Sequence, residues 1–210
     1  MKTILTTVLL LSTFLVQAQD KYTSAMLKQI DALYKSRTPE EYQASINSFD
    51  RIAAAEKNKF EPYYYAAFGN IMMAVNEAAP AKKDSFLDLA STNIDKAKTI
   101  KPNHSEIIAL EGFIHMIRVT VDPQSRGQEY SGKAFTAFNQ AVALNPENPR
   151  ALALLGQMQL GTARFFNSDS AEACATSGKA LEKFASYQPS SNLAPHWGKV
   201  IAEEVKASCK

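Results

Sequence analysis

Apolar residues recur along most of this chain at spacings of three and four, which is the pattern of helices with one buried face. One clear stripe precedes Pro102 and consists of Phe86, Ala90, Ile94, Ala97 and Ile100. Similar stripes precede Pro146 and Pro189. Because proline cannot continue a helix, each stripe predicts a helix that ends close to its proline.

Three glycines, Gly69, Gly112 and Gly156, recur with the same period of roughly 43 residues as the prolines. Each glycine follows an alanine by three positions and a large apolar residue by four. The glycines therefore mark a first helix in each unit, and the proline-terminated stripes mark a second. The sequence predicts three helix hairpins stacked in series.

At these positions the chain resembles the tetratricopeptide repeat (TPR) family. The matching second-helix residues are Ala90, Ile94, Ala97 and Pro102, then Ala134, Phe138, Ala141 and Pro146. The match covers residues 62–189, with units longer than the family's usual length of about 34 residues. The first helices fit less well, because Glu111, His115 and Gln159 stand where the family prefers apolar groups. The resemblance implies an all-α, TPR-like right-handed superhelix of antiparallel hairpins, in a diverged and exported bacterial form.

The same reading divides the chain into a leader and one helical domain over residues 19–210. The expected hairpins span 22–58, 62–101, 105–145 and 149–188, and the first of them is degenerate. A capping helix over 194–208 covers the apolar face that a stacked array leaves at its end. Residues 119–128 read as a connection between helices, because they contain Asp122, Pro123 and Gly127.

The first 18 residues read as a signal peptide. Lys2 precedes an apolar run from Ile4 to Val16, and the small residue Ala18 offers a cleavage site. The run is too short to span a bilayer, which needs about 20 helical residues. We therefore expect a periplasmic or secreted protein without a membrane span after cleavage.

Export makes the two cysteines informative, because an oxidising compartment allows them to pair. Cys174 lies near the start of one predicted helix, and Cys209 lies at the end of the last one. If these helices form an antiparallel hairpin, the two residues lie at similar heights, and a Cys174–Cys209 disulfide is expected. The alternative is a small buried thiol and a second thiol at a frayed terminus.

Charge and motifs exclude several function classes. A formal net charge of +2, from 23 basic and 21 acidic residues, lacks the concentrated positive field of a nucleic-acid-binding protein. The histidines, His104, His115 and His196, are not spaced as a helical metal site. There is no nucleophile elbow and no phosphate-binding loop. We therefore expect no catalytic residues, no cofactor and no metal, and hence no enzyme.

The TPR resemblance implies a concave surface, lined mainly by first helices, that holds extended peptides or partner helices. The candidate groove residues are Tyr63, Asn70, Met73, Glu106, Phe113, Met116, Arg150 and Gln157. For Met73, Phe113 and Met116 the alternative is a place in the core, and the two readings stay open.

The leading hypothesis is an exported, non-catalytic scaffold that binds a protein or peptide partner in the cell envelope. The alternatives are a small-molecule or glycan-binding module that uses the region around Tyr63, and a structural subunit of a larger envelope assembly. A long open groove favours the peptide, whereas a closed aromatic pocket favours the small ligand.

Overall fold

The computed structural model describes residues 21–209, and all regular structure within them is helical. A helix over residues 21–35 comes first. The later helices are α2 (Pro39–Ala55), α3 (Glu61–Asn76), α4 (Pro80–Ile100), α5 (Ser105–Val119), α6 (Pro123–Leu144), α7 (Pro149–Phe165), α8 (Ala171–Ser186) and α9 (Lys199–Ala207). The predicted signal peptide, residues 1–18, lies outside the described residues.

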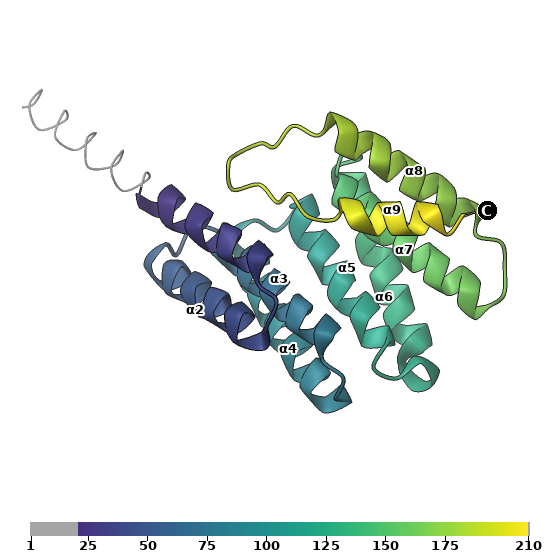
Figure 1. Ribbon diagram of the computed structural model, residues 1–210, viewed down its shortest axis with the longest axis horizontal. Coiled ribbons are helices and arrows are strands. Elements are labelled where there is room, and N and C mark those ends of the chain that lie inside the picture. Colours follow the sequence, from purple (N-terminus) through teal and green to yellow (C-terminus); the bar gives the residue numbers. More distant parts are fainter. Residues whose placement is uncertain (1–20, 210) are drawn as a thin grey trace, which may run out of the picture.

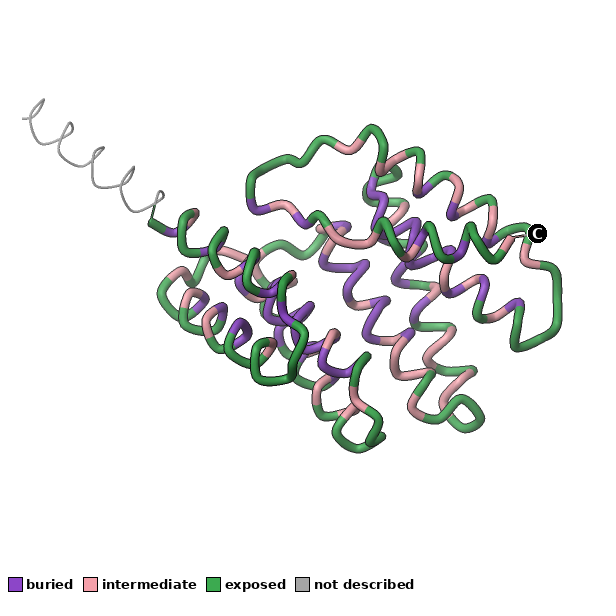
Figure 2. The backbone as a smooth tube through the Cα atoms, viewed as in Figure 1, coloured by how far each residue is buried: buried purple, intermediate pink, exposed green. Residues whose placement is uncertain are grey.

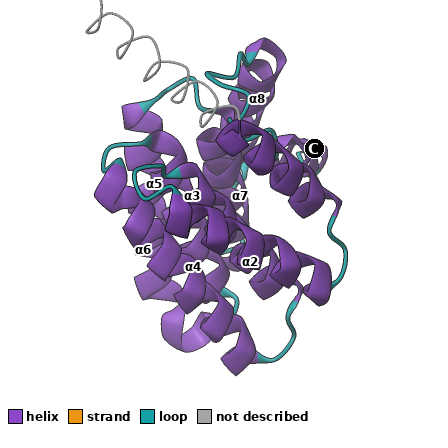
Figure 3. Cartoon of the chain, turned by 90° about the vertical axis from the view of Figure 1, so that its left-hand side faces the viewer, coloured by secondary structure: helices purple, strands orange, loops and turns teal. Residues whose placement is uncertain are grey.

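Successive helices pair into antiparallel hairpins that stack side by side (Figure 1). The first helices of the repeats, α3, α5 and α7, also pack on one another and form a central layer. Their second helices, α4, α6 and α8, lie on the outside (Figure 3). Helix α9 packs on both α7 and α8 (Figure 1). The predicted all-helical, TPR-like architecture is confirmed.

The central layer is apolar on nearly every side. In α5, all residues from Ile107 to Leu110 are buried, and so are Gly112, Phe113, Ile114 and Met116. Figure 2 shows the same concentration of buried positions along the central helices, with exposed positions on the outer ones. A helix that is apolar all round is covered on both faces. The concave side of this array is therefore covered as well as its convex side.

The repeated glycines mark places of close helix contact. A Cβ atom on Gly112 would lie 2.5 Å from a ring carbon of Phe138 on α6, and one on Gly156 would meet the Ser177 hydroxyl on α8. Gly69 instead packs against the preceding hairpin, where its Cβ would lie 2.8 Å from Ile46. Only hydrogen fits at these positions, which accounts for the glycine period seen in the sequence.

Helices α2 and α4 to α8 lie within the predicted hairpin ranges, and α3 begins one residue before its range, at Glu61. Two other boundaries differ more from the prediction. Helix α5 ends at Val119 and helix α6 already begins at Pro123, so most of the expected connection over 119–128 is helical. The Asp122 side chain caps α6 by accepting from the Ser125 N–H at 3.1 Å. Proline fits the first turn of a helix because it needs no N–H there.

The capping helix is the larger difference, because α9 begins at Lys199 rather than at 194. The chain from 187 to 198 is not helical and leaves α8 in a wide excursion before it returns to α9 (Figure 1). Val200 is 62% exposed, whereas Ala202 and Val205 form the buried face of α9.

The predicted disulfide is confirmed: Cys174 near the start of α8 is bonded to Cys209 just beyond α9, with the two Cα atoms 5.9 Å apart. The bond closes a loop of 35 residues, and closure of that length stabilises a fold by roughly 3 to 4 kcal/mol. Within residues 21–209, no helix combines the length and the apolar character needed to cross a membrane.

Candidate ligand-binding cavity

The non-helical residues 187–198, here named the strap, cross the face of the first helices. Tyr65 on α3 donates a hydrogen bond from its hydroxyl to the Leu193 carbonyl oxygen at 2.7 Å. The strap ends at Gly198, whose φ of 101° lies in the left-handed region that favours glycine. This turn aims the chain into α9, which the disulfide holds against α8.

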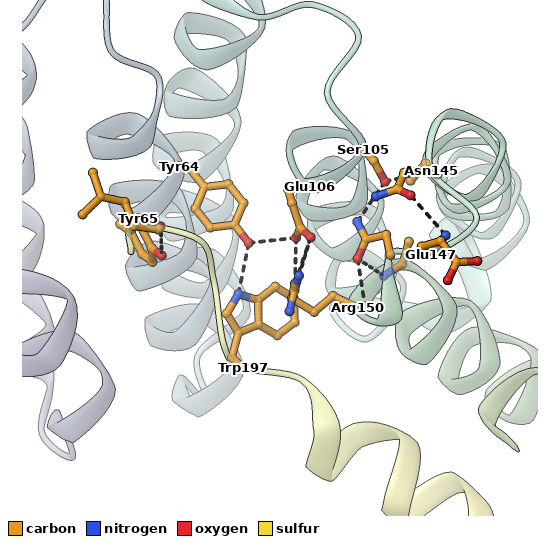
Figure 4. Close-up of polar contacts among 12 residues, drawn as sticks. Tyr64, Tyr65, Ser105, Glu106, Asn145, Glu147, Arg150 and Trp197 are labelled. Carbon is orange, nitrogen blue, oxygen red and sulfur yellow. Dashed lines mark hydrogen bonds and ion pairs between the residues drawn. The ribbon is translucent and has the colours of Figure 1, made fainter. Parts of the chain in front are cut away.

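Trp197 anchors the strap on the central layer. Its ring stacks on Phe68 of α3, with centroids 4.8 Å apart, and lies 6.1 Å from Phe113 of α5. Its indole Nε1 donates to the Tyr64 hydroxyl at 3.0 Å, as Figure 4 shows. The concave side of the repeats is therefore covered by the protein's own aromatic side chain.

A buried ion pair lies next to this anchor and joins α5 to α7 (Figure 4). The Arg150 Nε donates to both Glu106 oxygens at 2.9 Å, and Nη2 donates to Oε1 at 2.7 Å. The Arg150 side chain is 0% exposed, and its guanidinium lies 4.4 Å from the centre of the Tyr187 ring. Such a two-pronged pair fixes its partners closely, and removal of one partner leaves a buried charge.

The Tyr64 hydroxyl links the anchor and the ion pair. It accepts from Trp197 and donates to Glu106 Oε2 at 3.4 Å. Burial, followed by the nearby Glu106 charge, raises the pKa of Tyr64 well above its ordinary value. Burial likewise raises the pKa of Tyr65. Both phenol groups therefore stay protonated and keep their hydrogen bonds to groups of the protein.

A cavity of about 690 Å³ opens between the strap, the start of α3, the α4–α5 turn and the end of α6. Its aromatic lining consists of Phe60, Tyr64, Tyr65 and Tyr187, and Leu144, Leu193 and Pro195 add aliphatic surface. The polar lining is Glu61, Lys101, Asn103, His104, Ser105, Glu106, Asn145, Gln188, Ser190 and Ser191. Ring surfaces beside polar groups are a feature of small-molecule sites, and this lining is rich in polar groups.

His104 belongs to this lining and packs against Phe60, with ring centroids 4.7 Å apart. Burial, aided by the charge of Lys101, lowers the pKa of His104 to about 4. The imidazole is therefore neutral at pH 7. Its buried Nδ1 has no hydrogen-bond partner among the described residues.

The residues predicted for the groove lie near this face, but most are buried in it. Met73, Phe113 and Met116 are in the core, as the alternative reading had it. Asn70 is buried and donates to the Ala66 carbonyl oxygen of its own helix at 2.9 Å. Gln157 is half-buried.

Two of the other predicted residues, Glu106 and Arg150, form the buried ion pair, and Glu106 also lines the cavity. Tyr63 is not part of the cavity lining. Lys96 of α4 lies over its ring, with Nζ 5.7 Å from the ring centroid. The structure thus brings Glu106 to the cavity wall and Arg150 beneath it, and leaves Tyr63 outside.

The strap and its cavity escaped the sequence reasoning. Trp197 lies within the predicted capping helix over 194–208 and Tyr187 within the predicted hairpin over 149–188, whereas both belong to the strap. A signal was present in the run from Pro189 to Pro195, whose serines and asparagine favour turns over helix. Within residues 21–209, no group of three or more His, Cys, Asp or Glu side chains is placed to hold a metal ion.

No family model matches the sequence, and no curated protein matches it. Among solved structures, the HusA haemophore from Porphyromonas gingivalis superimposes with a TM-score of 0.80 at 31% sequence identity. The match covers 90% of this chain and 92% of that chain. The chain belongs to the family of the HusA haemophore.

A second solved structure resembles this HusA-family protein in fold alone. TTC0263, a thermophilic TPR protein of Thermus thermophilus, superimposes with a TM-score of 0.51 at 18% identity, covering 81% of this chain and 87% of that one. The HusA relative is named as a haemophore, which is a kind of binding protein.

Proposed function

We propose that this HusA-family protein is an exported carrier that binds haem, or a closely related tetrapyrrole, as cargo in the strap cavity. The observation that carries the proposal is the cavity itself, because its volume and the Phe60 and Tyr187 rings in its lining suit a flat macrocycle with acidic substituents. Sites for compact organic ligands enclose roughly 300 to 1,000 Å³, and this one has about 690 Å³. The described relative is a haemophore.

The side chains around the cavity supply the contacts that a tetrapyrrole needs. Phe60 and Tyr187 offer ring faces and edges for stacking, and Leu193 and Pro195 offer aliphatic surface. His104 is the histidine of this lining, and its neutral state is the one that binds metals. The Tyr64 and Tyr65 hydroxyls are already engaged with Glu106 and Leu193.

A peptide in the concave groove fits the structure less well. Trp197 covers Phe68 and Phe113, and the strap backbone accepts a hydrogen bond from Tyr65. An extended peptide would have to displace these contacts before it reached the first helices. The cavity therefore favours the small-ligand alternative. Tyr64 and Tyr65 of the Tyr63 region line it, whereas Tyr63 itself lies under Lys96.

Export is supported by the cysteines. Disulfides persist in oxidising compartments and are rare in the reducing cytosol. The Cys174–Cys209 bond fastens α9, and with it the far end of the strap, to α8. A carrier outside the cytosol keeps this bond, and the bond keeps the cavity wall in place.

Titration with haemin tests the proposal. Trp197 is the single tryptophan of the chain and lies 3.0 Å from the Tyr64 hydroxyl at the cavity wall. Haemin bound there should quench Trp197 emission and shift the haemin absorption band, and both signals should saturate at one haemin per chain. Metal-free protoporphyrin, titrated in parallel, measures what iron contributes through His104.

Two aromatic variants serve as a matched pair. Tyr187→Ala removes a ring from the cavity wall and should weaken haemin binding by roughly tenfold, the usual effect of losing one stacked ring. Phe166→Ala removes an exposed ring at the α7–α8 turn and should leave binding unchanged. Equal losses in both variants, or no saturable binding to the unaltered chain, would contradict the proposal.

A further inference from the structure

The strap cavity contains one cation without a counter-charge. Lys101 is the only lysine or arginine in the described lining of the cavity, and it forms no ion pair with any described carboxylate. We propose that Lys101 binds a carboxylate of the ligand and so makes the cavity selective for acidic tetrapyrroles over their neutral esters. This inference rests on the proposed function and names the group that recognises the acid edge of the cargo.

Three other cations on the helices around the cavity each have a carboxylate partner. Lys98, three residues earlier on α4, lies 2.9 Å from Glu111 on α5. Arg150 beneath the cavity is paired with Glu106 at 2.7 Å. Lys183 on α8 is paired with Glu147 at 2.6 Å. Around the cavity, the fold thus gives each of these cations a carboxylate and leaves Lys101 without one.

The carboxylates of the cavity wall do not compete for Lys101. Glu106 receives three hydrogen bonds from Arg150 and one from Tyr64. Glu61 accepts from the Tyr22 hydroxyl at 3.2 Å. A ligand carboxylate would be repelled by these groups and attracted to Lys101, so the charges define a direction. The acid edge of the macrocycle should face the α4–α5 turn, and its apolar edge the strap.

The backbone of Lys101 is fixed while its side chain lies over the cavity wall. Its N–H donates to the Ala97 carbonyl oxygen at 2.9 Å, which closes α4, and its Nζ lies 5.0 Å from the centre of the Phe60 ring. A lysine at a helix end also interacts favourably with the helix dipole and with an aromatic ring. Neither of those two structural roles of Lys101 depends on whether the ligand carries free carboxylic acids. A comparison of an acidic ligand with its neutral ester therefore distinguishes them from binding of a ligand carboxylate.

The test compares haemin, which has two free propionates, with its dimethyl ester, which keeps the iron and the macrocycle. Both are titrated into the full chain and into Lys101→Gln, with Trp197 quenching and haem absorbance as readouts. Lys101→Gln should weaken haemin binding by roughly tenfold and leave the ester unchanged, because a charge-assisted hydrogen bond is lost only with the acid. Haemin binding by the unaltered chain should weaken with added salt, and this dependence should shrink in the variant.

Lys83→Gln is the matched control. Lys83 lies at the opposite end of the same helix, about 27 Å from Lys101 at 1.5 Å per residue. The same change of charge at Lys83 should alter neither the affinity for haemin nor the affinity for its dimethyl ester. Equal effects of Lys101→Gln on haemin and ester would overturn the inference while leaving the proposed function standing. Failure of the unaltered chain to bind either compound would instead reject the proposed function itself.

Discussion

The two ends of the helical stack treat charge and aromatic surface in opposite ways. At the strap end, the aromatic residues are largely covered, and Lys101 has no carboxylate partner among the described residues. At the hairpin-turn end, where α3 meets α4, α5 meets α6 and α7 meets α8, Asp84 is shared by Arg118 and Arg126 at 3.1 and 2.7 Å. There, Phe165 and Phe166 are 68% and 70% exposed.

Cavity volume alone does not distinguish these ends. The hollow at the hairpin-turn end, which Phe165 and Arg126 help to line, is the larger, with about 960 Å³ against 690 Å³. It is an open depression whose charged groups already neutralise one another. The strap cavity is less open and combines ring surfaces with a cation that has no carboxylate partner. The comparison teaches that side chains without protein partners, more than volume, distinguish the proposed ligand site.

The largest expected effect concerns the ion pair at the strap end. Arg150→Met should lower the free energy of unfolding by about 3 to 5 kcal/mol, because it leaves the Glu106 carboxylate buried without its counter-charge. Arg126→Met at the hairpin-turn end should cost less than about 1 kcal/mol, because that pair is partly exposed. Urea unfolding followed by circular dichroism measures both.

A double variant sharpens this comparison. If the unpaired Glu106 carboxylate causes the loss of stability, Glu106→Gln combined with Arg150→Met should recover part of the stability lost in Arg150→Met alone. Similar losses in Arg150→Met and Arg126→Met would remove the contrast between the two ends.

The next effect uses two glycines of α7. Gly156→Ala should destabilise the fold by about 1 to 3 kcal/mol, because the added Cβ meets the Ser177 hydroxyl and lies 3.3 Å from its backbone nitrogen. Gly161, closer to the hairpin-turn end, has nothing within 4 Å of such a Cβ, so Gly161→Ala should stabilise the helix by about 0.5 to 1 kcal/mol. Thermal unfolding of both variants checks the opposite signs, and a shared sign would show that packing at Gly156 is not the reason for glycine there.

The smallest effect concerns His104. Burial lowers its folded pKa to about 4, below the unfolded value near 6.5, so the unfolded chain takes up the proton first as the pH falls. Stability from this group is therefore full above about pH 6.5 and is lost between pH 6.5 and 4. Because the imidazole is partly exposed, the loss should be on the order of 1 kcal/mol. His104→Gln should reduce the change in the urea unfolding midpoint between pH 7 and pH 5. An unchanged pH dependence of the midpoint would show that other groups cause it.

How far the sequence predicted this protein depends on the range of the interactions. The helices of the repeats follow from local periodicity, from prolines at helix ends and from caps such as Thr38, which accepts from the Glu41 N–H at 3.3 Å. The cysteine pair followed from helix geometry and from the expected compartment. The groove residues were harder, because helical spacing shows that Met73 and Phe113 face inward without showing what covers them.

The sequence by itself thus determined the hairpins and their order, since both depend on helix period and residue size over short distances, and it predicted the disulfide. The tertiary structure alone decided that residues 187–198 cross the first helices, that Trp197 covers Phe68 and Phe113, and that Phe60, Lys101 and His104 meet Tyr187 around one cavity. The reason is physical: the Tyr64–Trp197 contact joins residues 133 positions apart, and packing of α9 on α7 and α8, rather than any local pattern, directs the strap across α3 and α5.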